Sequence, residues 1–171
     1  MYKRQDGNGA VSGHVRIYQN NNGTWEKVGV DIDGESYSDR FGYSVDLSAD
    51  GSVVAIGAFY NSATGKQSGH VRLYKNNNGT WEKIGDDIDG EAAGDQSGNS
   101  VSLSVDGSVV AIGAHGHDFG RGHVRIYQNN NGTWQQIGDD IDGEAIGDFF
   151  GSSVSLSVVR RISCCDWSIS Q

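Results

Sequence analysis

The chain has 171 residues, 26 of them glycine and none proline, and its formal net charge is −9. A surface with this charge repels a phosphate backbone, so nucleic acid is excluded as an expected partner. No apolar run is long enough to cross a membrane, and no charged and then apolar leader follows Met1. The chain itself therefore predicts neither membrane insertion nor a signal peptide.

The chain is built from an internal repeat. Closely similar segments begin at Gly13, Gly69 and Gly122, which are 56 and 53 residues apart, and the first reads GHVRIYQNNNGTWEKVG. A second motif, SVDLSADGSVVAIGA from Ser44, returns as SVSLSVDGSVVAIGA from Ser100. Regular spacing of this length indicates an array of similar structural units. We therefore assign residues 1–158 to repeats whose units start near residues 13, 69 and 122.

Each unit predicts four short strands in chain order. The alternating segment HVRIY at 14–18 is followed by NNNG, which favours a hairpin turn into TWEKVG at 24–29. After an acidic loop, YSVDLS at 43–48 is predicted as the third strand and VVAIGA at 53–58 as the fourth. A turn at Asp50 and Gly51 joins these two antiparallel strands. Because VVAIGA is apolar on both faces, we expect this strand to be buried on both sides.

Four antiparallel strands per repeat are the content of one β-propeller blade. The sequence therefore predicts an all-β fold of β-propeller-type blade repeats, an incomplete propeller of about two and a half blades. A β-sandwich of unrelated strands would not need the repeat, and a β-solenoid would use shorter repeats, so both are less favoured alternatives.

Two aromatic residue types recur at fixed repeat positions. A tryptophan occupies one position in every unit, which predicts packing between blades; these residues are Trp25, Trp81 and Trp134. A histidine begins the first strand of every unit, which predicts a packing or hydrogen-bonding role; these residues are His14, His70 and His123.

The last segment, residues 159–171, breaks the pattern and holds both cysteines. The third unit should continue with DGSVVAIGA but reads VRRISCCDWS. With suitable codons, residues 160–169 read one nucleotide out of frame encode DGSVVAIGA. We therefore interpret 159–171 as an aberrant, out-of-frame tail in which Cys164 and Cys165 have no designed role. A genuine tail with a reactive cysteine pair is the alternative.

Short motifs in the repeat resemble the FG-GAP family, whose repeats build the propeller of integrin α-chains. Phe41-Gly42 precedes YSV, Gly57-Ala58-Phe59 follows VVAI, and Phe150-Gly151 repeats the first motif. The middle unit departs from the family pattern with Ser97-Gly98, and no unit has the proline.

The resemblance implies a β-propeller, a binding or adhesion role, and an extracellular or cell-surface location. It also implies calcium ligands between the Phe-Gly and Gly-Ala motifs. The turn segments there read SADGS and SVDGS, in which Asp50 and Asp106 each remain alone, beside a turn glycine. We therefore expect the calcium site of the family to be absent from that position.

A different acidic loop recurs before each Phe-Gly position, reading DIDGESYSD at 31–39, DIDGEAAGD at 87–95 and DIDGEAIGD at 140–148. Acidic residues at its positions 1, 3, 5 and 9 could converge on a calcium ion through carboxylate oxygens. The candidate ligands are Asp31, Asp33, Glu35, Asp39, Asp87, Asp89, Glu91, Asp95, Asp140, Asp142, Glu144 and Asp148. A turn-rich connection whose aspartates cap backbone amides is the alternative.

The sequence NGT recurs in the predicted hairpins, at Asn22, Asn78 and Asn131. Each is an N-glycosylation acceptor if the chain enters a secretory pathway, and each is also good hairpin chemistry without a sugar.

One loop, GAHGHDFGRG, occurs in a single unit and contains His115, His117 and Asp118. These residue types can bind a transition metal, but a solvated loop is the favoured interpretation.

Together these features predict a non-enzymatic binding or adhesion scaffold that takes a protein or glycan ligand, with calcium as a candidate cofactor. Repetition argues against catalysis, because an active site is usually singular. The other expected partners are the remaining blades of a parent propeller or a second copy of the chain. A nonfunctional truncated or frameshifted product, and a fragment of a propeller enzyme, are the alternatives.

Overall fold

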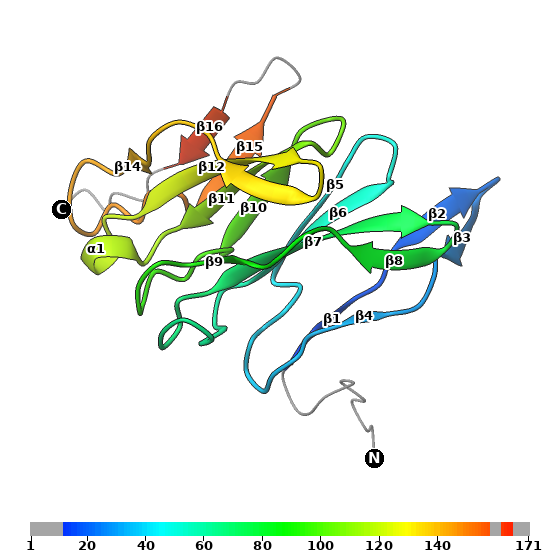
Figure 1. The fold of residues 1–171 in the computed structure, drawn as a ribbon, viewed down its shortest axis with the longest axis horizontal. Helices are drawn as coiled ribbons and strands as arrows, with labels where there is room; N and C mark the ends of the chain where they lie inside the picture. Colours follow the sequence, from blue (N-terminus) through cyan, green and yellow to red (C-terminus); the bar gives the residue numbers. More distant parts are fainter. Residues whose placement is uncertain (1–11, 158–161, 166–171) are drawn as a thin grey trace.

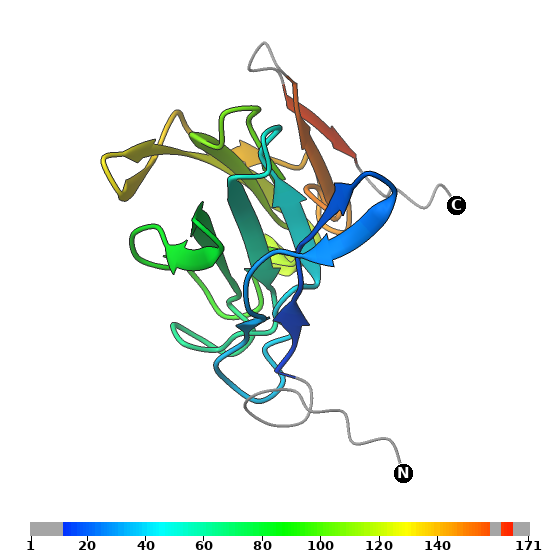
Figure 2. The ribbon, with the colours of Figure 1, turned by 90° about the vertical axis from the view of Figure 1, so that its right-hand side faces the viewer.

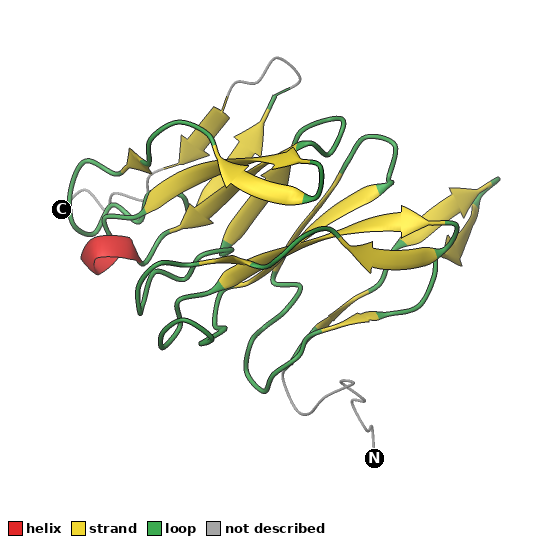
Figure 3. Cartoon of the chain, in the orientation of Figure 1, coloured by secondary structure: helices red, strands yellow, loops and turns green. Residues whose placement is uncertain are grey.

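The computed structural model describes residues 12–157 and 162–165, and their regular structure is almost entirely β-strand (Figures 1 and 3). The elements are β1 (His14–Val15), β2 (Tyr18–Asn21), β3 (Thr24–Lys27), β4 (Ile32–Asp33), β5 (Ser44–Leu47), β6 (Val53–Ala58), β7 (His70–Asn77), β8 (Thr80–Lys83), β9 (Ile88–Asp89), β10 (Ser100–Leu103), β11 (Val109–Ala114), α1 (His117–Gly120), β12 (His123–Asn130), β13 (Thr133–Gln136), β14 (Ile141–Asp142), β15 (Ser153–Leu156) and β16 (Ile162–Cys165). The all-β prediction is confirmed. None of the helices in the described part of the chain has the length and apolarity needed to cross a membrane.

Two complete antiparallel sheets form the body of the molecule. One has the strand order β5-β6-β7-β8 and the other β10-β11-β12-β13, and β9 and β14 pair with β7 and β12 respectively. The sheets lie next to each other like blades (Figures 1 and 2), and their first strands, β5 and β10, are in contact. Asp46 on β5 links these two strands, because its Oδ2 accepts a hydrogen bond from the amide of Leu103 at 2.6 Å.

The predicted hairpins are confirmed, but the blade is offset from the sequence unit. VVAIGA of one unit pairs with HVRLY of the next, with Ala58 opposite His70, so β6 and β7 belong to one sheet. The acidic loop instead carries the chain from the outer strand of one blade to the inner strand of the next. The described residues thus contain the outer strands of a first blade (β1 to β4), two complete blades, and two inner strands of a last one (β15 and β16).

The core lies between blades. Every residue of β6 and β11 is buried, as predicted for VVAIGA. Alternate residues of β6 point to opposite sides: Val54 and Ile56 pack toward the first blade, whereas Val53 and Ala55 pack toward the next. Each complete sheet therefore depends on both of its neighbours for burial of its apolar side chains.

Glycine at the Phe-Gly and Gly-Ala motifs allows adjacent blades to approach closely. A Cβ atom at Gly57 would lie 2.1 Å from the carbonyl oxygen of Gly98 in the next blade, and Gly98 has a φ of +81°. The contact recurs one blade later, where a Cβ at Gly113 would lie 2.0 Å from the Gly151 oxygen. No larger residue fits this approach, which explains why both motifs keep their glycine where Phe and Pro are lost.

The repeated tryptophan joins each blade to the one before it, as predicted. Trp81 Nε1 donates a hydrogen bond to the Val28 carbonyl oxygen at 2.9 Å, and Trp134 Nε1 donates to the Ile84 oxygen at 3.0 Å. Trp25 has no preceding blade among the described residues and is 67% exposed, whereas Trp81 is 9% exposed.

Residues 162–165 of the aberrant segment form a strand at the place that VVAIGA takes in the other units. β16 pairs with β15, with Val154 opposite Cys164 and Leu156 opposite Ile162. The second pair is equivalent to Leu103 opposite Val110 in the preceding blade. Residues 158–161 and 166–171, including Trp167, lie outside the described residues. The out-of-frame origin of the tail stays a prediction, which sequencing of the transcript across this segment would test.

The tryptophan contact predicts unequal effects at one repeat position. We expect Trp81→Ala to lower the free energy of unfolding by about 3 kcal/mol or more, because it removes a buried ring and an interblade hydrogen bond. Trp25→Ala should cost less than about 0.5 kcal/mol, as a surface substitution does. Urea unfolding of dilute protein measures both. Equal losses would contradict the assigned role.

Candidate binding groove between two blades

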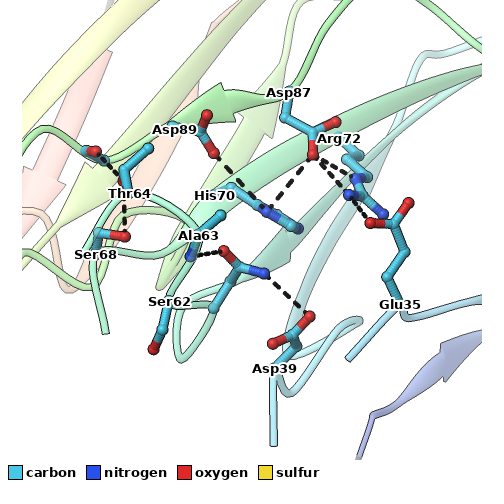
Figure 4. A network of polar contacts seen from close by, with 12 residues as sticks. Glu35, Asp39, Ser62, Ala63, Thr64, Ser68, His70, Arg72, Asp87 and Asp89 are labelled. Carbon is cyan, nitrogen blue, oxygen red and sulfur yellow. Dashed lines mark hydrogen bonds and ion pairs between the residues drawn. The ribbon is translucent and has the colours of Figure 1, made fainter. Parts of the chain in front are cut away.

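The first acidic residue of each loop neutralises an arginine of its own blade. Arg72 on β7 donates to Asp87 Oδ2 from Nε at 2.9 Å and from Nη2 at 2.6 Å (Figure 4). The same pair recurs as Arg125 with Asp140 and as Arg16 with Asp31. A lysine at the end of the neighbouring strand also contacts Asp87 and Asp31; these residues are Lys83 and Lys27.

The glutamate of each loop crosses to the arginine of the next blade. Glu35 Oε2 lies 2.6 Å from Arg72 Nη2, and Glu91 Oε2 lies 2.5 Å from Arg125 Nη2. Arg72 is nearly buried, with 6% of its side chain exposed. Its two carboxylate partners come from different blades, so the arginine couples blades as well as strands.

The last aspartate of each loop holds the loop itself. Asp39 Oδ2 accepts a hydrogen bond from the amide of Ser36 at 3.2 Å. Asp95 and Asp148 accept the equivalent amide hydrogen bonds at 2.8 and 2.6 Å. Asp39 also accepts from Asn61 Nδ2, at 3.0 Å, in the loop between β6 and β7. These contacts support the interpretation that the loop aspartates cap backbone amides.

The second acidic residue of the loop, at position 3, lies in a short strand beside the repeated histidine. Asp89 on β9 is paired with His70 on β7, and the Oδ1 of Asp89 is 4.0 Å from His70 Nδ1. His70 is buried, and this burial lowers its pKa, so the imidazole is uncharged at neutral pH. The packing role predicted for this histidine agrees with its 1% exposure.

Among the residues that the structure describes, two sets of ligand atoms lie close enough to hold a metal ion, one in each complete blade. They are His70 with Asp87 and Asp89, and His123 with Asp140 and Asp142, with the atoms of each set within 4.8 Å. In both sets the first aspartate already binds an arginine, so a bound cation would have to compete with that positive charge.

The four acidic positions of one loop therefore reach three different places. Positions 1 and 3 meet the histidine and arginine of their own blade, position 5 reaches the next blade, and position 9 caps the loop. The sequence period alone could not separate this arrangement from a calcium loop, because the cations come from distant strands. Calcium binding stays a prediction for these loops.

Removal of calcium by a chelator distinguishes a calcium loop from a loop whose carboxylates are held by arginine, lysine and backbone amides. Because arginine, lysine and backbone amides already bind these carboxylates, we expect the melting temperature to be the same in EDTA and in millimolar calcium. A melting temperature that falls in EDTA and returns with calcium would instead support the calcium interpretation.

The Arg72 network should contribute to stability in a pH-dependent way. Burial alone would raise the pKa of Asp87, but the bonds from Arg72 and Lys83 outweigh it and lower this pKa to about 2. A carboxyl with a lowered pKa stabilises the fold above its unfolded pKa of 3.8, and this stabilisation is lost as the pH falls toward 2.

We therefore expect Arg72→Leu to destabilise the fold by about 3 kcal/mol at pH 7, because it leaves the half-buried carboxylate of Asp87 without its arginine partner. The difference from the unchanged protein should narrow between pH 4 and pH 2. Arg16→Leu is the matched control: Arg16 is 47% exposed, so its loss should destabilise dilute protein much less than the loss of Arg72. Denaturant unfolding at several pH values measures these effects, and equal losses for the two variants would contradict this account.

An open groove of about 470 Å³ lies against this network. It is bounded by the acidic loop after β4, the loop between β6 and β7, and the start of β7 (Figure 4). Its lining consists of Glu35, Ser36, Tyr37, Ser38, Asp39, Tyr60, Asn61, Ser62, Ala63, Lys66, Gln67, His70, Arg72 and Asp87.

Much of the groove lining does not repeat. Tyr37 is 69% exposed and corresponds to Ala93 in the next unit, and Tyr60 corresponds to Gly116. The guanidinium of Arg40 stacks 4.3 Å from the centre of the Tyr60 ring. The repeat pattern does not predict this cluster, because the pattern contains only what the units share. The signal was available as the aromatic residues that only one unit has.

The equivalent position between the two complete blades is occupied by the histidine loop. His117 Nδ1 lies 3.0 Å from Asp95, and its ring packs 4.2 Å from that of His123. Asp118 pairs instead with Arg121, and His115 faces Phe149. The histidines and aspartate of this loop therefore do not converge on one site.

The three candidate glycosylation asparagines lie at hairpin turns, each with a φ of +51°. The preceding Asn20 Oδ1 accepts the amide of Gly23 at 2.7 Å, and Asn76 and Asn129 make the same bond in the other blades. The positive φ and the hydrogen bond in each turn explain why NNNG recurs. Glycosylation stays a prediction for Asn22, Asn78 and Asn131.

Comparison with known proteins agrees with the predicted family. Residues 30–74 match the model of the FG-GAP repeat. The chain contains an FG-GAP repeat. The matched segment runs from the acidic loop through the Phe-Gly and Gly-Ala motifs to β7. A comparison with curated proteins yields no match.

Two solved structures, both candidate 6-phosphogluconolactonases, share the fold. The one from Bacteroides fragilis has a TM-score of 0.58 at 14% identity, and covers 91% of this chain and 37% of its own. The one from Bacteroides uniformis has a TM-score of 0.59 at 14% identity, with 90% and 41% covered. Both are propeller-like, so the partial β-propeller prediction is confirmed. The chain spans less than half the length of either structure.

Proposed function

We propose that this FG-GAP chain is a non-enzymatic binding scaffold whose groove beside Arg72 takes a neutral glycan. The observation that supports this proposal is the contrast between repeated and unrepeated residues. Glycine, tryptophan and arginine recur in each blade and make interblade contacts. Tyr37 and Tyr60 belong to one unit only and face an open groove.

The chemistry of the lining favours a glycan over a protein ligand. Protein interfaces are usually anchored by fully buried apolar and aromatic residues. This groove instead offers hydroxyl groups, amides and charges around two tyrosine rings. A sugar has hydroxyl groups for the polar atoms and an apolar ring face for the aromatic surface. The volume of about 470 Å³ lies in the range of small-ligand sites.

The charge of the lining favours a neutral sugar. Glu35, Asp39 and Asp87 face the groove together with Lys66 and Arg72, so the charges nearly balance. The arginine already binds two of the carboxylates and is held in place by them. A strongly anionic ligand would meet these carboxylates and lose affinity.

A wider role in adhesion at the cell surface is part of the same proposal. It rests on the FG-GAP repeat, which the chain shares with integrin α-chains by family resemblance. Propeller ends present several loops on one face, and a groove between two such loops is a suitable place for recognition.

The experiment is a titration of the protein with a panel of neutral oligosaccharides, in which saturation-transfer NMR measures binding. We expect binding that Tyr37→Ala and Tyr60→Ala each weaken by about tenfold or more. Ile146→Ala is the matched control, because it changes the same repeat position as Tyr37 in the third unit and Ile146 is 66% exposed. Absence of binding at millimolar sugar would contradict the proposal.

Two other outcomes identify the alternatives. Binding of a protein ligand that depends on the same tyrosines would keep the scaffold and replace the glycan. Turnover of 6-phosphogluconolactone, the substrate named for the two structural neighbours, would replace the binding role with an enzymatic one.

A further inference from the structure

The repeated histidine of each complete blade has a buried ring nitrogen without a hydrogen-bond partner in the described chain. His70 is 1% exposed and His123 is 3% exposed, and the Nδ1 atom of each makes no hydrogen bond to any described residue. A buried polar atom without a partner costs free energy, so folded proteins usually satisfy it with a group of the chain, a bound water or an ion. The same atom recurs in two blades, which points to a partner that both blades share.

The Nδ1 atom of His70 faces two carboxylates (Figure 4). It lies 3.8 Å from Asp87 Oδ2 and 4.0 Å from Asp89 Oδ1. Both distances are too long for a hydrogen bond. Two ligand atoms of one zinc ion lie at most about 4.2 Å apart, because each lies about 2.1 Å from the metal. The nitrogen and the two oxygens are therefore close to the separation that a shared ion requires.

Strand pairing fixes this arrangement in both complete blades. Asp89 on β9 lies opposite His70 on β7, and Asp142 on β14 lies opposite His123 on β12. Side chains alternate along a strand, so the aspartates on either side of the buried Ile88 project to the other face, toward the histidine. The segment Asp-Ile-Asp thus presents two carboxylates to one imidazole in each complete blade.

The first aspartate of each set already binds an arginine, so the balance of charge around the set decides whether it can also hold a cation. The carboxylates of Asp87 and Asp89 lie beside a third one, that of Glu35, which shares the arginine. Two cations, Arg72 and Lys83, contact these groups. Three negative charges against two positive ones leave this set with a net attraction for a divalent ion.

The second set has one positive charge fewer. Its three carboxylates belong to Asp140, Asp142 and Glu91, and among the described residues Arg125 is the one charged basic side chain that contacts them. Gln136 takes the place of Lys83, and its Nε2 donates a hydrogen bond to Asp140 Oδ1 at 2.7 Å. A divalent ion should therefore bind more tightly to this set than to the first one.

We propose that each complete blade binds a divalent transition-metal ion such as zinc, through Nδ1 of its repeated histidine and the two aspartates, more tightly at His123 than at His70. Imidazole together with carboxylates suits zinc, whereas calcium takes oxygen ligands. The carboxylates are partly exposed, at 21% for Asp87 and 37% for Asp89, so an ion can enter and water can fill its remaining coordination positions. Positions 5 and 9 of the acidic loop take no part, in contrast to a calcium loop.

Calorimetric titration of the full chain with zinc chloride tests this proposal, after EDTA treatment and dialysis have removed bound metal. We expect at least two zinc ions per chain, of which Asp142→Asn weakens the tighter and Asp89→Asn the weaker by tenfold or more in Kd. Asp139→Asn is the matched control, because it removes the same charge from an exposed neighbour outside the set and should leave both sites intact. Zinc should also raise the melting temperature of the stripped protein, which is the sample for the calcium comparison as well.

A charge exchange tests the predicted order of the two sites. Gln136→Lys adds the missing positive charge beside Asp140 and should weaken the tighter site by about tenfold. Lys83→Gln removes the corresponding charge beside Asp87 and should strengthen the other site by a similar factor. Each blade shows that the residue introduced into the other one fits this position.

The imidazole signals in a long-range proton–nitrogen NMR spectrum identify the ligand atom. Zinc should shift the Nδ1 signals of His70 and His123 before those of the other three histidines. Shifts confined to His115 and His117 would mean that zinc binds only to the exposed loop, and would overturn the proposal.

No zinc binding up to millimolar concentration, binding that Asp89→Asn and Asp142→Asn leave unchanged, or displacement of zinc by an equal concentration of calcium would also overturn it. These outcomes are independent of glycan binding, because His123 and its two aspartates do not line the groove beside Arg72.

Discussion

A strand that is apolar on both faces has to be covered on both sides, and the packing of neighbouring blades depends on this constraint. In β6, Val54 and Ile56 pack toward one neighbour while Val53 and Ala55 pack toward the other. Neither face can be left in water without losing the burial that stabilises the sheet. The close glycine approach and the tryptophan bond follow from it, because they bring the next sheet near enough to cover that face. No disulfide is needed among residues 1–157, where the sequence has no cysteine.

Features that repeat were predictable from the sequence, because the same interaction has to be made in each blade. The hairpins, the buried VVAIGA strands and the position of the tryptophan between blades could all be inferred from local pattern and recurrence. The blade boundary could not, since VVAIGA and HVRLY lie in different sequence units and are joined only by pairing. The role of the acidic loop was also hidden, because the partners of Glu35 and Asp87 include Arg72, whose position depends on the fold.

Residues that differ between units carry the information about function. The loop between β6 and β7 contributes Tyr60 and Asn61 to an open groove, whereas the shorter loop of the next blade places His117 against Asp95. The framework around the two positions is the same, with an arginine, a histidine and acidic residues in each. An array of this kind can vary one loop at a time without altering the contacts that hold its blades together.

The central claim is that a blade is ordered by its neighbours more than by its own sequence. The identical segments HVRIYQNN at 14–21 and 123–130 allow a direct measurement, by hydrogen exchange of both segments in dilute protein. We expect slow exchange at 123–130, which β11 covers, and much faster exchange at 14–21. Equal protection of the two segments would mean that the strand is fixed by local sequence, and would contradict the account.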